Sequence, residues 1–372
     1  MNWTYSQPVQ IQFGNGCHKQ AASLARERGY QRGFLVSDSF FAQNGTAQRI
    51  LDESQGILVG VYSDISPNPE VSEVNRCALA LRQAQADFVV ALGGGSALDC
   101  AKAASCTALT GEDIQVYHGT GVPIPAEHLP IIAIPTTSGT GSEVTCVSVL
   151  SNHETGLKGP IVSSSFYPAL ALIDPELTYT MPRAVTASCG IDTLCHAVES
   201  FWSKNHQPIC DALAIHATRL VFQYLERACD HPDDALAREK MSEASVIAGL
   251  AFSLPKTTAS HACSYPLTNL FHIPHGEACG LTLDHFCRIN RPAENYRLDV
   301  FSQQLGFSDA DTMADAILAL KQRLGLRTDL KDLHLTEDQK QELSRASLHP
   351  NILNNPVEIT YEMLYSMYSS MC

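Results

Sequence analysis

Short apolar runs alternate with longer segments of helical spacing through the first half of the chain. Apolar runs that suit strands occupy residues 9–13, 33–37, 56–62, 87–92 and 129–134. The first of these alternates apolar and polar side chains, as an edge strand does. Apolar residues recur at helical spacing in residues 17–28, 70–85 and 97–108. Strands separated by helices of this length indicate βαβ units, so the sequence predicts an α/β fold with a mainly parallel sheet.

The second half of the chain has less glycine and is dominated by helix formers. Helical spacing covers residues 186–200, 208–228, 232–254, 309–324 and 337–346. We therefore expect an α/β domain over residues 1–181 and an all-helical domain over residues 182–372, with Pro182 at the boundary. A cleft between two such domains is a common place for a site.

The composition narrows the class of partner. The 372-residue chain has a net charge of −14 and no cluster of Lys and Arg, which argues against nucleic acid. No apolar run reaches the ~18 residues that a membrane span needs, and no signal peptide is visible. The 13 cysteines include no Cys-x-x-Cys pair. We therefore expect reduced thiols, a cytoplasmic location and a small-molecule partner, with no membrane.

A glycine-rich turn follows one of the predicted strands. Gly93, Gly94, Gly95 and Ser96 leave the strand at residues 87–92 and open a helix, where backbone N–H groups can approach a pyrophosphate. The turn is not a full G-x-G-x-x-G, because Leu98 stands where the last glycine belongs. A turn of this composition is also common as a plain connection between a strand and a helix that binds no ligand, and that interpretation stays open.

Two further stretches suit a dinucleotide. Asp38 ends the strand at residues 33–37, where a carboxylate can bind an adenosine ribose and so favour NAD(H) over NADP(H); a loop or capping role is the alternative. Residues 135–145 form a loop rich in hydroxyl groups and glycine directly after an apolar strand, which favours ligand contact. Lys158 can place a cation near the same ligand, although a lone Lys is usually solvated.

Asp192 and His196 stand four residues apart in a segment without proline. On a helix they lie on one face, where a carboxylate and an imidazole can bind one divalent metal ion. Such a pair, taken alone, is more often solvated or capping. His261 and His275 can complete a four-ligand set, and Pro266 and Pro274 bracket the segment between them. We therefore expect His261 on a helix and His275 in a turn before the next helix.

The cysteines near these residues have a simpler explanation. Cys189, Cys195, Cys263 and Cys279 lie close in sequence to the candidate ligands, and small core residues are the favoured interpretation for each.

Several of these stretches together resemble the iron-containing (group III) alcohol dehydrogenase family. The matching segments span most of the chain in the family's order: residues 67–69, 93–102, 135–143, 174–177, 190–199 and 273–276. The resemblance implies a dehydroquinate synthase-like fold, with a dinucleotide-binding α/β domain and an all-helical domain that holds a catalytic metal.

The resemblance also assigns residues to each ligand. It implies that the metal is held by Asp192, His196, His261 and His275. It implies that the cofactor is lined by Asp38, Asn68, Gly94, Gly95, Ser96, Asp99, Thr136, Thr137, Thr140 and Lys158. We expect catalytic contributions from Asp99, Lys256, Tyr265 and His272.

One position departs from the family's pattern. Family members often carry a second His four residues after the third metal ligand, and this chain has Tyr265 there. A Tyr hydroxyl can pass a proton but titrates near ~10 when unperturbed, which puts a His-like relay near neutral pH in doubt. His272 is a possible substitute, although a turn or surface role is the commoner one for such a residue.

The segment at residues 257–268 is similar to the phosphonoacetaldehyde reductase (hydroxyethylphosphonate dehydrogenase) branch of the family. Lys256, Lys158 and Arg183 are candidate cations for a phosphonate, with a solvated role for Lys256 as the alternative.

The expected activity is hydride transfer between NAD(P)H and a small aldehyde or primary alcohol, with the metal as Lewis acid. Fe²⁺ is favoured by the resemblance, and Zn²⁺ fits the same ligands. The alternatives are a general primary-alcohol or polyol dehydrogenase of the glycerol dehydrogenase kind, a dehydroquinate synthase, and a non-catalytic nucleotide and metal sensor. Homo-oligomers are usual in the family, so we expect a homodimer or a higher homo-oligomer.

Overall fold

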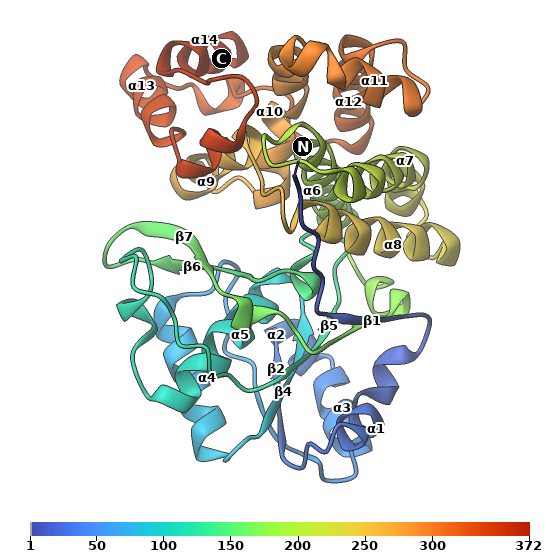
Figure 1. The fold of residues 1–372 in the computed structure, drawn as a ribbon, viewed down its shortest axis with the longest axis vertical. Coiled ribbons are helices and arrows are strands. Elements are labelled where there is room, and N and C mark those ends of the chain that lie inside the picture. The colour runs from blue at the N-terminus through green and yellow to red at the C-terminus, as the bar shows by residue number, and fades with distance from the viewer. Residues whose placement is uncertain (1) are drawn as a thin grey trace. The chain divides into compact units, whose positions relative to one another are not determined.

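A six-stranded parallel sheet organises the first part of the chain in the computed structural model, which describes residues 2–372 (Figure 1). The strand order is β1-β8-β5-β4-β2-β3. The strands are β1 (Gln10–Phe13), β2 (Gly33–Ser37), β3 (Leu58–Tyr62), β4 (Phe88–Gly93), β5 (Ile131–Pro135) and β8 (Leu170–Ile173). The four inner strands are buried along their whole length, whereas β1 and β3 are partly exposed. The expected edge position of β1 is confirmed.

Helices cover both faces of this sheet because successive side chains of each strand point to opposite faces. Phe34 and Val36 of β2 pack with α4 (Val71–Gln83) and α5 (Gly95–Thr110). Leu35, from the same strand, packs on the other face with α1 (Ala21–Glu27), α2 (Ser39–Gln43) and α3 (Thr46–Glu53). The 3-10 helices of this part are η1 (Cys17–Gln20), η2 (Ile114–Val116), η3 (Ser142–Val144), η4 (Ser164–Phe166) and η5 (Pro175–Thr178).

An antiparallel hairpin of β6 (Val147–Asn152) and β7 (Leu157–Val162) was not predicted from the sequence. The buried face of β6 carries Ser148 and Asn152 beside Leu150, so it does not show the apolar alternation of an ordinary half-buried strand. Ser148 is tolerated there because its hydroxyl donates to the Asp99 carbonyl at 2.8 Å. The strand therefore lacks the apolar alternation from which strands are predicted, because tertiary hydrogen bonds satisfy polar residues on its buried face.

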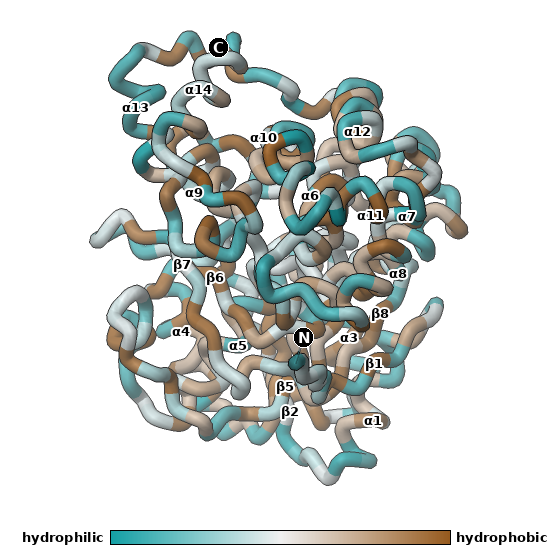
Figure 2. Tube along the Cα trace, turned by 45° about the horizontal axis from the view of Figure 1, so that its top comes forward, coloured by the Kyte–Doolittle hydropathy of each residue, from teal (hydrophilic) through white to brown (hydrophobic). Residues whose placement is uncertain are grey.

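The second part of the chain is helical. Its helices are α6 (Arg183–Trp202), α7 (Pro208–Asp230), α8 (Ala235–Phe252), α9 (Ala259–Phe271), α10 (His275–Asn290), α11 (Arg297–Gln304), α12 (Ala310–Leu324), α13 (Glu337–Ala346) and α14 (Tyr361–Met371), with η6 (Ala293–Asn295), η7 (Lys331–Leu333) and η8 (Pro350–Asn354). The central helix, α6, is buried almost throughout from Gly190 onward and packs against α7, α8 and α10. By contrast α13, mostly teal in Figure 2, buries only Leu343 and Ser344.

The expectation about prolines needs one correction. Pro266 does not end the helix that carries His261, because α9 continues through it from Ala259 to Phe271. His275 is also already helical, as the first residue of α10 after Pro274. The missing N–H of Pro266 costs one helical hydrogen bond, but this part of α9 is buried in the helical core, and such packing can keep the helix continuous.

The structure separates into two compact units. One consists of residues 6–137 and 141–178; the other contains residues 179–372 together with residues 138–140 and the N-terminal residues up to Tyr5. The domain boundary predicted between residues 181 and 182 stays a prediction. Within residues 2–372, no helix has the length and apolar character needed to cross a bilayer.

Candidate functional site

Helix α6 presents Asp192 and His196 on one buried face of the helical unit. The His196 ring stacks on Phe252, with ring centroids 4.2 Å apart, and its Nδ1 lies 3.2 Å from the Gly139 carbonyl oxygen. Since a carbonyl only accepts, Nδ1 carries the proton and Nε2 offers a lone pair. Two contacts thus fix both the orientation and the tautomer of this imidazole.

His261 is held by a buried carboxylate that the sequence interpretation overlooked. Glu199 accepts a short hydrogen bond from His261 Nδ1. The Glu199 Oε1 atom also accepts from the Thr258 hydroxyl at 2.8 Å and from the Ser260 amide at 2.7 Å. A carboxylate that orients a ligand imidazole is the usual outer partner in metal sites. A signal was present in the sequence, because Glu199 follows Asp192 and His196 at positions i+7 and i+3 of one helical face.

His275 opens α10 and lies beside the other two imidazoles. Its Nδ1 lies 3.3 Å from the Ser264 hydroxyl, and its Nε2 lies 3.8 Å from the Cys279 sulfur one turn along the same helix. One ligand atom each from Asp192, His261, His275 and Cys279 lies within 4.8 Å of the others. Cys279 therefore belongs to the cluster geometrically, in addition to packing in the core as expected.

The cluster has the dimensions of a divalent metal site. His196 Nε2 and His261 Nε2 are 3.0 Å apart, and His261 Nε2 lies 3.5 Å from Asp192 Oδ1. Bonds of ~2.1 Å at tetrahedral angles place ligand atoms about 3.4 Å apart. Asp192 Oδ1 is buried and has no hydrogen-bond partner among residues 2–372. A buried carboxylate oxygen without a donor, facing imidazole nitrogens, is what a cation would satisfy.

The electrostatics favour the ligand forms of Asp192 and His196. Burial lowers the pKa of His196 to about 4, so its imidazole is neutral at physiological pH. Burial alone would raise the pKa of Asp192, but His196, His261 and His275 lower it below its usual range. An anionic carboxylate and neutral imidazoles are the protonation states that bind a metal. Burial alone would lower the pKa of His261, but Cys279, Glu199 and Asp192 raise it well above its usual range, so a metal would have to displace the proton of this imidazole.

The remaining candidates of the helical unit differ in their surroundings. Tyr265 is buried with its ring centroid 6.3 Å from that of His275, and burial raises the pKa of its hydroxyl to about 12. His272 is exposed at the C-cap of α9. Lys256 is half-buried between α8 and α9. Arg183 donates to the Leu324 carbonyl at 2.7 Å and forms an ion pair with Asp230, so its guanidinium binds the end of α12.

In the α/β unit, the predicted phosphate-binding turn lies at the carboxyl end of β4. Gly93 has φ +152°, and a Cβ there would lie 2.8 Å from Asp38 Oδ2. A Cβ on Gly94 would meet the Thr137 side chain at 3.3 Å. Helix α5 begins at Gly95, so its first N–H groups face the end of the sheet, where the backbone can approach a phosphate closely.

Side chains of the predicted cofactor site meet at this edge. The Asp38 carboxylate accepts from the Phe41 amide at 3.0 Å and caps α2, while burial raises its pKa. The Lys158 ammonium donates to Asn68 Oδ1 at 2.7 Å, and the backbone N–H of Asn68 donates to the Ser96 hydroxyl at 3.2 Å. The Thr136 amide donates to the Gly93 carbonyl at 3.0 Å. By contrast Thr140 belongs to the helical unit.

Asp99 has a structural explanation. One carboxylate oxygen accepts from the Ser142 hydroxyl at 2.7 Å and the other from the Val149 amide at 2.9 Å. Lys102 donates to the carbonyls of Ser142 and Val147 at 2.7 and 2.8 Å. Asp99 and Lys102 therefore anchor the hairpin to α5, and a contact of Asp99 with the cofactor stays a prediction.

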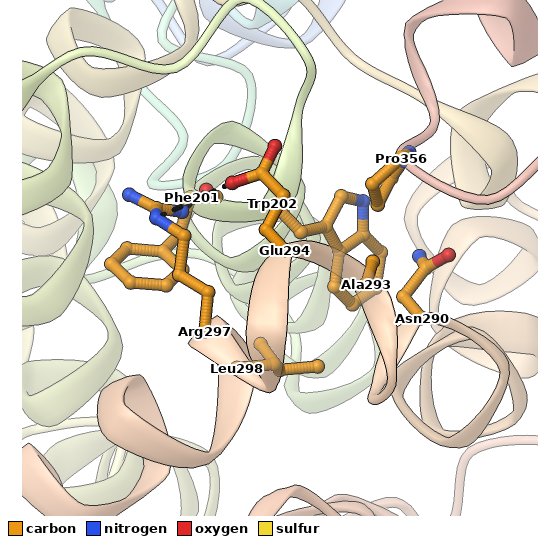
Figure 3. A pocket seen from close by; sticks show the side chains of 8 residues that line it. All are labelled: Phe201, Trp202, Asn290, Ala293, Glu294, Arg297, Leu298 and Pro356. Atoms are coloured by element: carbon orange, nitrogen blue, oxygen red, sulfur yellow. Dashed lines mark hydrogen bonds and ion pairs between the residues drawn. The ribbon is translucent and has the colours of Figure 1, made fainter.

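A separate hollow in the helical unit contains none of the predicted residues. It is lined by Phe201, Trp202, Asn290, Ala293, Glu294, Arg297, Leu298 and Pro356 (Figure 3). The Arg297 guanidinium lies 3.7 Å from the centre of the Phe201 ring, donates to the Phe201 carbonyl and pairs with Asp211 at 2.5 Å. The positive charge of Arg297 is thus paired with groups of the protein itself.

Comparison with known families decides what this arrangement belongs to. Residues 8–175 match the sequence model of the iron-containing alcohol dehydrogenases, and residues 186–372 match that of the C-terminal domain of the Fe-containing alcohol dehydrogenase family. The chain belongs to the iron-containing alcohol dehydrogenase family. The predicted family and the predicted fold class are confirmed, and the chain is an oxidoreductase of the alcohol dehydrogenase type.

Individual members of the family match along most of the chain. Alcohol dehydrogenase 4 of Schizosaccharomyces pombe is 33% identical over 365 residues, which cover 96% of this chain and 86% of that protein. The 1,3-propanediol dehydrogenase of Klebsiella pneumoniae is 33% identical over 356 residues, covering 90% and 91%. The crystal structure of sulfoacetaldehyde reductase from Bifidobacterium kashiwanohense in complex with NAD+ is 57% identical, with a TM-score of 0.98 and coverage of 100% and 99%.

Proposed function

We propose that the protein is a metal-dependent reductase that uses NADH to reduce a short aldehyde carrying an anionic group. Sulfoacetaldehyde is the favoured substrate: sulfoacetaldehyde, NADH and a proton give 2-hydroxyethanesulfonate and NAD+. The observation that carries this proposal is the 57% identity over the whole chain to a sulfoacetaldehyde reductase. Phosphonoacetaldehyde is the second candidate, because residues 257–268 resemble that branch of the family.

In this proposal Asp192, His196, His261 and His275 hold the metal. A divalent ion at this site would polarise the carbonyl and stabilise negative charge on its oxygen during hydride transfer. Glu199 orients His261, the Gly139 carbonyl orients His196, and Ser264 contacts Nδ1 of His275. The Nε2 atoms of His196 and His261 lie 3.0 Å apart, whereas the group of mutually close ligand atoms contains Cys279 in place of His196. We favour Fe²⁺ because of the family, while the donor set also suits Zn²⁺.

The α/β unit would bind the dinucleotide. The turn at Gly94 and Gly95 and the start of α5 would receive its pyrophosphate. Asn68, Ser96, Thr136, Thr137, Thr140 and Lys158 are the further residues that we assign to the cofactor. Asp38 would accept hydrogen bonds from the adenosine ribose and repel a 2′-phosphate, which favours NAD(H).

The reduction also consumes a proton. The Tyr265 hydroxyl stays protonated at neutral pH because burial raises its pKa to about 12. We therefore assign it the role of a hydrogen-bond donor near His275, and not that of the acid that protonates the alkoxide. We assign His272 and Asp99 no part in this proton transfer, since His272 is exposed and both carboxylate oxygens of Asp99 accept hydrogen bonds from protein donors.

Lys256 would supply positive charge for the anionic end of the substrate. It directly precedes Thr257 at the start of the segment that carries His261, and no acidic side chain within residues 2–372 forms an ion pair with it in the structure. We expect Lys256→Ala to raise KM for sulfoacetaldehyde far more than for propanal. Lys331→Ala, at an exposed position, is the matched control; equal effects of Lys256→Ala on both substrates would contradict the assignment.

The function is tested by following NADH oxidation with metal-loaded enzyme and a panel of aldehydes. The panel contains sulfoacetaldehyde, phosphonoacetaldehyde and propanal. A kcat/KM for sulfoacetaldehyde at least about a hundredfold above that for propanal, or ~2.7 kcal/mol of transition-state binding, would support the proposal. Preference for phosphonoacetaldehyde would select the second candidate. Equal rates with all three would indicate a general alcohol dehydrogenase, the activity after which alcohol dehydrogenase 4 of Schizosaccharomyces pombe is named.

A further inference from the structure

We propose that Thr257, Tyr265 and His349 form a cluster of hydrogen-bond donors that binds the sulfonate group of the substrate. We call these three residues the donor cluster, and Asn351 positions them. This inference rests on the proposed function, because it assigns the residues that would bind the sulfonate group of the proposed substrate.

The donor cluster lies next to the candidate metal ligands. Tyr265 follows His261 by one turn of α9, and its ring is stacked near that of His275. The His349 ring centroid is 4.5 Å from that of Tyr265, because η8 packs against α9. Thr257, His349 and Asn351 all retain partly exposed surface. A two-carbon aldehyde with its carbonyl at the metal would need its anionic end bound close by, as this cluster is.

Asn351 determines whether the hydroxyl groups of Thr257 and Tyr265 donate or accept hydrogen bonds. Its amide nitrogen donates to Thr257 Oγ1 at 2.9 Å and to Tyr265 Oη at 3.4 Å. Each hydroxyl therefore accepts one bond from Asn351 and keeps its own hydrogen to donate. Within residues 2–372, no protein acceptor receives either hydrogen, and neither oxygen is among the buried atoms that lack a partner.

The same residue fixes the tautomer of His349. The backbone N–H of Asn351 donates to His349 Nδ1 at 3.3 Å. Since Nδ1 accepts, the ring hydrogen is on Nε2, which makes that atom a donor. Asn354 holds the other side of the cluster by donating to the Thr257 carbonyl at 3.0 Å. Three donor hydrogens, from two hydroxyls and one imidazole, are thereby left for a ligand.

A sulfonate is complementary to this arrangement. It carries three oxygens that only accept, it is anionic at every physiological pH, and hydrogen bonds to an ionised acceptor are stronger than neutral ones. The unsubstituted tail of propanal cannot accept these hydrogens, so it would leave the donors unpaired. The adjacent Lys256 adds positive charge beside Thr257. The cluster would thus contribute binding that depends on the anionic end of the substrate.

Two nearly isosteric variants test the cluster in the metal-loaded enzyme. Thr257→Val removes one donor at constant shape. Asn351→Asp replaces the amide donor by a carboxylate, which would accept the two hydroxyl hydrogens and repel the anion. We expect Thr257→Val to lower kcat/KM for sulfoacetaldehyde by roughly tenfold to a hundredfold and Asn351→Asp by more, in both cases far more than for propanal. Binding of ethanesulfonate, measured by calorimetry, should weaken in parallel while the metal content stays the same.

Thr268→Val is the matched control, because its hydroxyl is buried on the same helix and has no hydrogen-bond partner among residues 2–372. We expect it to change neither substrate preference nor ethanesulfonate binding. If the wild-type enzyme does not prefer sulfoacetaldehyde, the proposed function and the cluster both fail. If it does, but both variants keep that preference and bind ethanesulfonate as the wild type does, the cluster alone is refuted.

Discussion

At the scale of single residues, the chemistry depends on side chains whose protonation and orientation are set by neighbours. Asp38 is an example, since its carboxylate both caps α2 and lies beside Gly93 at the end of β4. A cap is worth about 1 kcal/mol, and the negative charge is what would exclude a 2′-phosphate. The two contributions can be separated by substitution.

We expect Asp38→Asn to raise the kcat/KM for NADPH relative to NADH by about tenfold, or ~1.4 kcal/mol. The Asn side chain keeps an oxygen for the Phe41 amide, so the unfolding temperature should change little. Asp38→Gly should relax the preference similarly but lower the unfolding temperature, because the cap is lost. Cofactor kinetics and thermal unfolding measure the two effects, and an unchanged NADH preference in both variants would argue against the ribose role.

Glu143 gives the fold a predicted pH dependence. Burial raises its pKa to about 7 in the folded protein, above the ordinary value of 4.5. The folded state therefore holds this proton more tightly than the unfolded state. The resulting stabilisation is complete below about pH 4.5 and is lost as the pH rises through 7.

We expect Glu143→Gln to stabilise the protein increasingly from pH 5 to pH 7.5, by about 2 kcal/mol over that interval. Denaturant unfolding at the two pH values measures the difference. Glu127→Gln changes an exposed Glu and is the control for net charge. A stability difference that does not vary with pH would mean that Glu143 is not protonated in the folded state.

At the scale of elements, close helix packing sets the geometry of the metal cluster. Helices α6 and α10 approach closely at Gly276, where a Cβ would lie 2.0 Å from the Ser188 carbonyl oxygen and 2.9 Å from the Asp192 Cβ. The neighbouring backbone cannot yield without moving a helix. Glycine at this point therefore allows His275 and Asp192 to share one site.

We expect Gly276→Ala to destabilise the protein by about 1–3 kcal/mol and to weaken metal binding, because α10 must shift away from α6. Gly159→Ala is the matched control, since a Cβ at Gly159 would meet no heavy atom within 4 Å from the described residues, apart from its two chain neighbours. Metal content after dialysis and thermal unfolding measure the two effects. Normal metal content in Gly276→Ala would show that the ligands tolerate a shift of the helix.

At the scale of the whole molecule, a bound metal should stabilise the fold through mass action. An ion present at a hundred times its Kd stabilises the folded state by about 2.7 kcal/mol if it does not bind the unfolded chain. We expect a chelator to lower the unfolding temperature and abolish activity, with both restored by Fe²⁺. His196→Ala should lack metal and activity while remaining folded, and the chelator should not change its unfolding temperature. A wild-type protein that is insensitive to chelation would contradict the metal assignment.

Parts of this protein follow from the sequence alone. The alternation of strands and helices, the helical second half and the spacing of Asp192 and His196 are local patterns, which neighbouring residues encode through periodicity. The motifs were specific enough to identify the family, because they occur in one order along the chain.

Other features were decided only by tertiary structure. The hairpin β6–β7 could not be predicted from periodicity, because the buried face of β6 is partly polar. Its Ser148 is satisfied by a hydrogen bond to the Asp99 carbonyl of α5, which the local sequence does not reveal. Glu199 reaches His261 across 62 positions of sequence, and Cys279 joins the cluster only because α10 packs beside α6 and α9. Asn351 meets Thr257 across 94 positions. Such contacts depend on how helices pack in three dimensions, and no periodicity along the chain records which distant side chains will meet.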